Sequence, residues 1–573
     1  MYKANRRHLQ PLLISNIQDL PEKHRERLEQ SWAGVFYRET FCRLKEEPFA
    51  VLYEGLPSRP NIPVNVLVGL ETLKAGFGWS DEELYDHYVF DLQVRYALGY
   101  RDLKDGEFDV RTLYNFRRRL SQYNQAQGVN LLERAFEDIT DQQIQALQVK
   151  TGWQRMDSTQ IASNIMDMSR LQLLVEAIQR LYRMLSEADQ QRYAPEFAAY
   201  LSQSARQFAY HLKGKEATHR SIQQVGESIW VMLSKLQAGY GNEAAFQVLQ
   251  RFFDDNFHVT EQSVTAKLNE EIEAGCLQSC DDLEATFRRK AEKEYKGYVA
   301  NVSESCDPSN PCQLITLVQV APNVAEDSDL MQAALPVLKQ RTGLEKLNTD
   351  GGYGSPDLDQ ALHSLQVEHI PTAIKGRQPD PAKLGLAAYA IQVDAQGLPT
   401  QLTCPHGQVG PVRLGAKKSA FLADFDPRVC QNCPFHLAGQ CRAKPGKRDP
   451  HYHLDFNLHE TQVARRRQAK DQQKHSGHNL RAAVEATMRS IKHAFPGGKL
   501  PVRGLFRMTS MMIASALMCN VRSILRFLQA QRKLEKSSRA GQPSASSHVF
   551  DPILAALSTL LCRLSYHWVS FSC

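Results

Sequence analysis

The chain has 573 residues and a mass of 64.9 kDa, which is too long for one ordinary domain and predicts about three or four. Hydrophobic residues make up 42% and charged residues 23%, a globular composition that excludes a disordered or fibrous protein. The net charge of +6 is unevenly spread: residues 401–550 hold 25 Lys/Arg against 8 Asp/Glu, a local +17 that leaves −11 for the remainder. Such asymmetry indicates a polyanionic partner, although a solvated basic face gives the same count.

The sequence predicts neither a membrane span nor an export signal. The most apolar segments, 508–521 and the C-terminal end, are interrupted by Asn520 and Arg563, so neither has the roughly 18 uninterrupted apolar residues of a spanning helix. The basic N-terminus is not followed by the apolar core that a secretory signal needs. We therefore expect a cytoplasmic protein without a membrane partner.

Residues 1–125 have the periodicity of helices. Ser80-Asp-Glu-Glu83 is a capping box, which predicts a helix that begins after Ser80. A further helix, expected to begin near residue 110, carries three consecutive arginines: Arg117, Arg118 and Arg119. Short helices that end in arginines are typical of a helix-turn-helix domain. This N-terminal domain therefore either contacts DNA ends through these arginines or is a plain helical bundle.

From about residue 147 the pattern becomes a mixture of strands and helices. Strands are expected at 148–162, 297–302, 314–320, in a run ending at 350, and at 367–374, with helices at 329–341 and 357–365 and a long helical section over about 165–290. Without that section the order is strand, strand, strand, helix, strand, helix, strand, as in an RNase H-like mixed sheet. We therefore predict a mixed α/β (α+β) fold whose RNase H-like core begins within 145–375 and carries a large helical insertion.

Four of the twelve cysteines are grouped in the sequence: Cys404, Cys430, Cys433 and Cys441. Cys430-x2-Cys433 has the spacing of a zinc knuckle, and the Pro and Gly residues around it predict a small, loop-rich insert at 378–450 that a structural zinc ion would hold together. His406 and His436 are alternative ligands. Four free thiols, or a redox pair, are the competing interpretation.

Helices are expected over most of 455–533, and the polar, Ser-rich start of 534–573 predicts a linker before a C-terminal tail. Within the helical part, four residues share one helical face at i, i+4, i+7 and i+11: Arg481, Glu485, Met488 and Lys492. A carboxylate flanked by two cations can bind a metal ion while the cations hold phosphate oxygens. A salt-bridged surface stripe has the same spacing.

Two aspartates occupy strand positions that suggest a catalytic or metal-binding role. Asp157 lies within a strand, where aspartate is disfavoured unless its carboxylate is used. Asp350 ends another apolar strand and precedes Gly351-Gly-Tyr-Gly-Ser355, whose glycines permit a tight turn close to a ligand. Each aspartate taken alone also fits a simple turn or pairing role.

Taken together, RMDSTQIASN around Asp157, NTDGGYGSPD around Asp350 and the Arg481-x3-Glu485-x6-Lys492 helix resemble the DDE transposases of bacterial insertion sequences. They match the branch with a Tyr-x2-Arg-x3-Glu-x6-Lys signature, an N-terminal helical domain and a Cys-rich segment. The chain has His478 where that signature has Tyr, which affects one phosphate or base contact and no metal ligand.

The resemblance implies that Asp157, Asp350 and Glu485 are catalytic and bind two Mg²⁺ (or Mn²⁺) ions, with Asp157 as the bridge. Two such ions activate the attacking oxygen and stabilise the leaving oxygen in an in-line displacement at phosphorus. The implied DNA contacts near the third acid are His478, Arg481 and Lys492. The implied partner is double-stranded DNA, both the insertion-sequence ends and the target, held by a dimer at the nucleoid of a bacterial cytoplasm.

Two other functions fit the same residues. A non-catalytic DNA-binding protein, such as a decayed transposase acting as a repressor, would keep the helical domain and the cysteines, but here all three carboxylates are present. An RNase H-like nuclease would cut without joining, and only the Arg-Glu-Lys helix favours a transposase over it. The sequence contains no Walker A loop, Gly-x-Ser-x-Gly elbow or His-Glu-x-x-His motif that would indicate another enzyme class.

Overall fold

The computed structural model describes residues 2–540, except 10–14, 54–59, 211, 213, 262, 291, 374–379, 395, 416–419, 447–448, 477–479 and 481. The chain from Met1 to Ile524 forms one compact unit, and a second unit begins at Leu525. All strands of the described residues belong to the first unit, as do all helices except the last turns of α20 (Leu505–Ala540).

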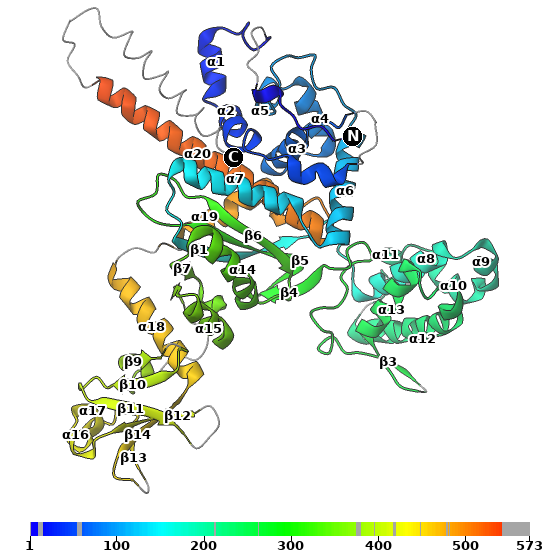
Figure 1. Cartoon of the computed structure of the whole chain (residues 1–573). Helices are drawn as coiled ribbons and strands as arrows, with labels where there is room; N and C mark the ends of the chain where they lie inside the picture. The colour runs from blue at the N-terminus through cyan, green and yellow to red at the C-terminus, as the bar shows by residue number, and fades with distance from the viewer. Residues whose placement is uncertain are drawn as a thin grey trace, which may run out of the picture. The chain divides into compact units, whose positions relative to one another are not determined.

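The N-terminal part of the chain is helical (Figure 1). Its elements are η1 (Arg7–Leu9), α1 (Glu22–Glu29), α2 (Trp32–Phe36), η2 (Tyr37–Phe41), η3 (Glu47–Leu52), α3 (Val64–Phe77), α4 (Asp81–Phe90), α5 (Leu92–Ala97), α6 (Arg111–Gln127) and α7 (Leu131–Leu147). The predicted capping box is confirmed, because the Ser80 hydroxyl accepts the Glu83 N–H and the Glu83 carboxylate accepts the Ser80 N–H. α3 is buried on nearly every side, so the other helices assemble around it.

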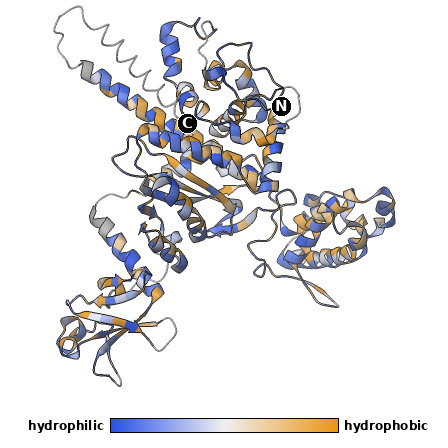
Figure 2. Cartoon of the chain, viewed as in Figure 1, coloured by the Kyte–Doolittle hydropathy of each residue, from blue (hydrophilic) through white to orange (hydrophobic). Residues whose placement is uncertain are grey.

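A six-stranded mixed sheet follows, and its strands are rich in apolar residues (Figure 2). The strands are β1 (Trp153–Ala162), β4 (Thr286–Lys290), β5 (Lys293–Ser305), β6 (Ile315–Pro322), β7 (Lys346–Thr349) and β8 (Glu368–Pro371). The long strand β5 is antiparallel to β1 on one side and to β4 and β6 on the other. β1, β7 and β8 run parallel to one another. The order is therefore β4 and β6 beside β5, followed by β1, β7 and β8.

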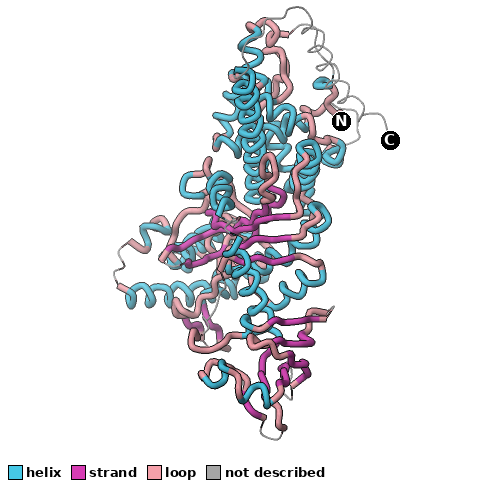
Figure 3. Tube along the Cα trace, turned by 90° about the vertical axis from the view of Figure 1, so that its left-hand side faces the viewer, coloured by secondary structure: helices cyan, strands magenta, loops and turns pink. Residues whose placement is uncertain are grey.

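Helices cover both faces of this sheet (Figure 3). α14 (Asp327–Thr342) and α15 (Pro356–Ser364) share an apolar core with Met156 of β1. Because successive residues of a strand point to opposite faces, Asp157 lies on the other face of β1. On that face α19 (Ala482–Lys492) packs against β1.

A helical lobe is inserted between β1 and β4 (Figure 1). Its elements are α8 (Arg170–Met184), α9 (Glu187–Arg192), α10 (Ala194–Leu201), α11 (Ala205–Phe208), α12 (Lys215–Tyr240), α13 (Ala244–Asn256), β2 (Phe257–Val259) and β3 (Val264–Ala266). One apolar core, which includes Leu174, Ile229 and Phe252, joins α8, α12 and α13. The helical section predicted for 165–290 thus ends at Asn256 and is followed by a short hairpin, where apolar residues alternate at the period of strands.

The Cys-rich insert is a second six-stranded sheet, so the prediction of a loop-rich segment was wrong. Its elements are η5 (Leu386–Ala388), β9 (Ala390–Val393), β10 (Pro399–Thr403), β11 (Val409–Leu414), β12 (Ala420–Phe425), α16 (Pro427–Gln431), α17 (Pro434–Leu437), β13 (Lys444–Pro445) and β14 (Tyr452–Asn457). β12 and β14 pair in antiparallel fashion, and alternate side chains of both strands are buried. Phe421 lies opposite Phe456. These aromatic residues form an apolar core of the insert's own.

α18 (Leu458–Ser476), α19 and α20 complete the described chain. In the first unit, the Asn520 side chain of α20 bonds both backbone groups of Ile315 at the start of β6, at 2.8 and 3.0 Å. α20 is the one described helix that is long and apolar enough to cross a membrane, but 67% of its most apolar window is buried in protein, as in a core helix. The first residues of the linker predicted from residue 534 are helical, because α20 continues to Ala540, and the rest of the predicted linker and tail, 541–573, lies outside the described chain.

Candidate active site

Asp157 of β1 and Asp350, directly after β7, occupy adjacent positions along these two paired parallel strands. β1 and β7 pair in parallel with Arg155 opposite Asn348, and both chains stay extended for two more residues, to Asp157 and Asp350. Neighbouring strands are about 4.8 Å apart, so this register brings the two aspartates side by side where β7 ends. Residues separated by 193 positions in the sequence therefore meet at one place in the fold.

A buried tyrosine lies beside both aspartates. Tyr353 is 0% exposed, and its hydroxyl donates a hydrogen bond to Asn301 Oδ1 at 2.8 Å. Burial raises the pKa of this hydroxyl well above its usual value, and the negative charges of Asp327, Asp157 and Asp350 raise it further. The tyrosine therefore stays neutral, and three carboxylates lie within electrostatic reach of it.

Backbone N–H groups orient two of these carboxylates. Asp157, which is 7% exposed, accepts the Ser158 N–H at 2.9 Å through Oδ1. Asp350 accepts the Gly352 N–H at 2.8 Å and caps the short turn η4 (Gly351–Tyr353). A backbone N–H one or two residues later in the chain therefore holds each carboxylate, which favours a single orientation of that carboxylate.

Asp327, at the start of α14, is a third carboxylate that sequence reasoning missed. A methyl group placed on Gly352 would lie 2.8 Å from Asp327 Oδ2 and 3.1 Å from Asp350 Oδ1, so the bare Gly352 Cα lies between the two carboxylates. Asp327 Oδ1 is buried without a hydrogen-bond partner among the described residues. Acids in the first turn of a helix are common for electrostatic reasons, so the sequence offered no signal that set Asp327 apart.

Glu485 is an exposed residue of α19, on the face of the sheet toward which Asp157 points. Val484, Met488 and Ile491 form the buried stripe of the same helix. The helix is bonded to the sheet at its middle and at its end, because the Thr487 hydroxyl donates to Glu304 of β5 at 2.8 Å and the Lys492 ammonium donates to the Thr159 hydroxyl of β1.

Lys492 lies close to the two aspartates in the fold. Thr159, its partner, is two residues beyond Asp157 on the same face of β1, and Lys492 also donates to the Gln160 carbonyl at 3.4 Å. Burial lowers the pKa of Lys492, and the charge of Lys293 lowers it further. The predicted DNA contacts Arg481 and His478 lie outside the described residues.

The donor set around Gly352 suits a hard divalent cation. Mg²⁺ binds carboxylate oxygens, and Asp327 has an oxygen without a hydrogen-bond partner among the described residues, while oxygens of Asp327 and Asp350 lie on the same side of Gly352. Within the described part of the chain, however, no three His, Cys, Asp or Glu side chains converge into a formed metal site.

The four clustered cysteines of the insert line one small cavity together with His406 and His436. The four are Cys404, Cys430, Cys433 and Cys441, all present as thiols. Burial raises the pKa of Cys430 to about 11, and the charges of the other three cysteines contribute. The fold thus brings the four thiols together, although in the described chain they do not converge into a formed metal site either.

The three N-terminal arginines differ in their surroundings. Arg117 donates to Glu71 at 2.7 Å and to Asp81 at 2.8 and 2.9 Å, so it joins α6 to α3 and α4. These ion pairs give Arg117 a structural role, and its contact with DNA stays a prediction. Arg118 and Arg119 are exposed, and Arg119 lies 5.1 Å from the ring centre of Tyr53. For these two, DNA contact stays a prediction.

Residues 403–525 match the family model described as a transposase DDE domain. The matched segment contains the clustered cysteines, Glu485 and Lys492, whereas Asp157 and Asp350 lie outside it. No match to the chain was found among curated proteins or among solved structures. The family match supports a DDE transposase, a class of DNA-cleaving enzymes that normally use divalent metals.

Proposed function

We propose that the chain is a transposase that binds the terminal inverted repeats of a bacterial insertion sequence and catalyses metal-dependent cleavage and strand transfer of DNA. The observation that carries this proposal is the register that sets Asp157 beside Asp350. Both aspartates lie outside the segment that matches the transposase DDE domain, and Glu485 lies within it. The strand register therefore supports Asp157 and Asp350, and the family match supports Glu485, the third acid of the proposed site.

We propose that the central sheet is an RNase H-like catalytic core. The support is its strand order, with an antiparallel β5 between β6 and β1 and with β7 and β8 parallel to β1. In such a mixed sheet the carboxyl ends of the parallel strands meet at one edge, where a ligand can bind. Asp350 follows the carboxyl end of β7, and Asp157 lies beside it within the longer strand β1.

In this proposal Asp157, Asp350 and Glu485 hold the divalent cations, with Asp157 as the bridge. The bound cations would activate the attacking oxygen and stabilise the leaving oxygen at phosphorus. The backbone N–H groups of Ser158 and Gly352 hold the carboxylates of Asp157 and Asp350 in place. Lys492 supplies a positive charge beside β1, where it can attract a DNA phosphate, and Arg481 and His478 are proposed as further phosphate contacts.

We propose a structural zinc ion for the insert, held by the four clustered cysteines. Its support is that one cavity collects all four thiols and that each of the other three lies within electrostatic reach of Cys430. Thiolate ligands in a closed set of four leave no open position for catalysis. In this proposal the zinc ion stabilises the insert and takes no part in cleavage.

The proposed partner is double-stranded DNA, bound by a dimer so that two ends can be joined. The local charge of +17 over residues 401–550, which surround Glu485, supports contact with the DNA backbone. Arg118 and Arg119 of α6 remain candidates for contacts to the DNA ends.

Cleavage of DNA by the purified chain tests this function. The substrate is a supercoiled plasmid carrying the DNA that flanks this gene on both sides, incubated with Mg²⁺, with Mn²⁺ or with EDTA. We expect metal-dependent cuts at the ends of the element, followed by joined products. Cuts without joined products would indicate a nuclease, and binding without cuts in any metal would indicate a repressor.

A further inference from the structure

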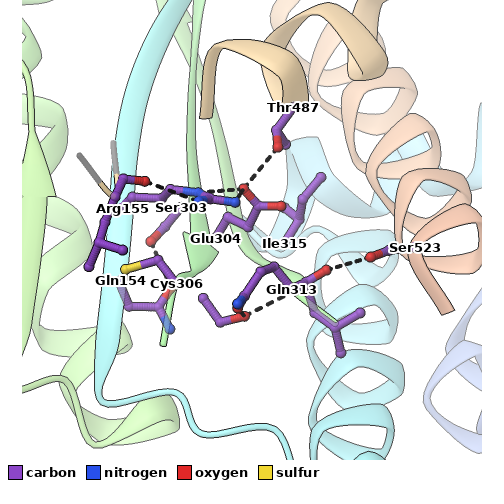
Figure 4. A network of polar contacts seen from close by, with 12 residues as sticks. Gln154, Arg155, Ser303, Glu304, Cys306, Gln313, Ile315, Thr487 and Ser523 are labelled. Atoms are coloured by element: carbon purple, nitrogen blue, oxygen red, sulfur yellow. Dashed lines mark hydrogen bonds and ion pairs between the residues drawn. The ribbon is translucent and has the colours of Figure 1, made fainter. Parts of the chain in front are cut away.

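A buried ion pair joins β1 to β5 beside the candidate site (Figure 4). Arg155 of β1 and Glu304 of β5 lie opposite each other in the antiparallel register, and both side chains are 9% exposed. The Arg155 guanidinium donates to Glu304 Oε2 from two nitrogens, at 2.7 and 2.8 Å. Two N–H groups on one carboxylate oxygen hold the guanidinium in one orientation.

The same pair makes two hydrogen bonds to the α19 segment, one just before the helix and one, to Thr487, within it (Figure 4 shows the second). A third guanidinium nitrogen of Arg155 donates to the Leu480 carbonyl at 3.0 Å, just before α19 begins. The Thr487 hydroxyl donates to Glu304 Oε2 at 2.8 Å. Glu485 lies between these points, five residues after Leu480 and two residues before Thr487.

Arg155 and Asp157 are two residues apart on β1 and therefore point to the same face of the sheet. The strand that carries Asp157 thus also carries the guanidinium that holds the helix with Glu485. We propose that Arg155, Glu304 and Thr487 form a positioning clamp that sets Glu485 relative to Asp157, and this inference rests on the proposed transposase function.

Stability alone does not account for a buried ion pair at this place. Removing two charges from water costs free energy, and apolar residues of similar size often stabilise a protein as well or better. The apolar contacts of Val484, Met488 and Ile491 already attach α19 to the sheet. Apolar contacts are not directional, whereas the hydrogen bonds of the clamp resist a shift of 1.5 Å or a turn of about 100° that would move the helix by one residue.

The opposite face of the same strands provides a contrast. Gln154 Oε1 accepts hydrogen bonds from the Ser303 hydroxyl at 3.1 Å and the Thr316 hydroxyl at 2.8 Å. These bonds join β1, β5 and β6 and involve no helix. Thr316 is therefore a matched control for Thr487, because each is a threonine whose hydroxyl makes a 2.8 Å hydrogen bond to a side chain of the sheet.

The test compares Thr487→Val, Thr487→Ser and Thr316→Val with the wild type, on the plasmid that carries the flanking DNA. Valine has the shape of threonine without its hydroxyl, so Thr487→Val removes the bond to Glu304 while the helix keeps its volume. We expect cleavage to fall by about 10- to 100-fold, as for a misplacement near 1 Å, and to need more Mg²⁺, while affinity for DNA is unchanged. Thr487→Ser keeps the hydroxyl and should restore most of the rate, and Thr316→Val should cut like the wild type.

A second measurement tests the clamp without cleavage. Hydrogen exchange should become faster in the amides of 482–492 in Thr487→Val, and Thr316→Val should leave these amides unchanged. Arg155→Met, which leaves Glu304 unpaired, should have the larger effect if it folds.

The outcomes separate the clamp from the function. Equal cleavage and equal Mg²⁺ requirement in Thr487→Val and wild type would overturn the clamp and leave the transposase intact. If the wild type does not cut DNA with any metal ion tested, the proposed function and the positioning role of the clamp in catalysis are both wrong. Unchanged exchange in α19 would overturn the clamp whatever the cleavage result.

Discussion

At the residue scale, the site depends on how closely the chain approaches the carboxylates after β7. Gly352 is the position where a side chain would meet both Asp327 and Asp350, at 2.8 and 3.1 Å from its Cβ. Real Cβ atoms essentially never lie within 3.0 Å of such an atom, so a methyl group there must displace Asp327. Because Asp350 belongs to the proposed metal site and Asp327 lies beside it, we expect this glycine to be needed for the position of these carboxylates rather than for backbone freedom.

Gly352→Ala is therefore expected to lower metal-dependent DNA cleavage by at least about 10-fold, because it separates carboxylates that must share a small space. The affinity for DNA should be unchanged, since the substitution removes no positive charge. Cleavage rate and DNA affinity, measured on the same plasmid, check this prediction.

Gly239→Ala is the matched control. Gly239 is exposed in α12, and beyond its own helical turns no heavy atom of the described chain lies within 4 Å of the place that a methyl group would take. This variant should cut like the wild type. Equal cleavage by Gly352→Ala and Gly239→Ala would show that the space between Asp327 and Asp350 is not used.

The sequence singled out residues with a distinctive setting and did not single out those without one. Asp157 and Asp350 were proposed because a charge interrupts or ends an apolar strand, and the strand register sets them side by side. Asp327 was missed because it resembles any acid at a helix start. The ion pairs of Arg117 were not predicted although a signal existed: it follows the buried Leu113 by four residues, so it belongs to the side of α6 that faces the protein.

At the scale of elements, an ion-pair cluster ties the N-terminal helices together. Burial alone would raise the pKa of Asp81 at the start of α4, but hydrogen bonds and charges from Arg117 of α6 and Lys74 of α3 lower it to about 2. A lowered pKa in the folded state means that the carboxylate stabilises the fold above its usual pKa of 3.8, and that this stabilisation is lost as the pH falls through about 2.

We therefore expect Asp81→Asn to lower the free energy of opening of α6 by about 2 kcal/mol at pH 7, with a difference that shrinks as the pH falls from about 4 to 2. Hydrogen exchange of the α6 amides at pH 7 measures this difference in the free energy of opening. Acid unfolding measures how the difference shrinks at low pH. Asp86→Asn, an exposed aspartate on the same helix, is the control. A difference that stays constant down to pH 2 would mean that the charge of Asp81 is not what stabilises these helices.

A second element-scale prediction concerns the cysteines of the insert. If zinc joins them, the purified chain should contain about one zinc ion, and zinc binding to the metal-free chain should release protons, because the raised pKa of Cys430 keeps that thiol protonated at neutral pH. The apparent zinc affinity should therefore rise between about pH 6 and 9. Less than about 0.3 zinc per chain, together with four titratable thiols in the insert, would exclude the structural zinc.

Elements with a clear hydrophobic period were predictable, and those without one were not. β5, β6, α14 and α15 follow from runs of alternating or helically spaced apolar residues. β4 was not predicted, because Arg288, Arg289 and Lys290 mask its strand character. In the insert, Pro and Gly near the cysteines favoured loops, while the alternation of Phe421, Ala423 and Phe425 was the signal that would have indicated a strand.

At the scale of the whole molecule, the site is assembled from segments far apart in the chain. Asp157 precedes the helical lobe, Asp350 follows it, and Glu485 follows the Cys-rich sheet. No local pattern could show that these residues meet, because only the pairing of β1 with β7 and the contact of α19 with β1 bring them to the same region. The central claim is therefore that three acids from three segments act as one metal-dependent site.

The most direct test is DNA cleavage by four proteins side by side: wild type, Asp157→Asn, Asp350→Asn and Glu485→Gln. Each substitution removes one carboxylate charge and keeps the shape of the side chain. We predict that the wild type cuts the plasmid at the element's ends in Mg²⁺, and that each variant binds the same DNA but cuts at least about 1,000-fold more slowly, as expected for ligands of the catalytic metal. Cutting at the wild-type rate by any one of the three variants would contradict the assignment of a single three-acid site.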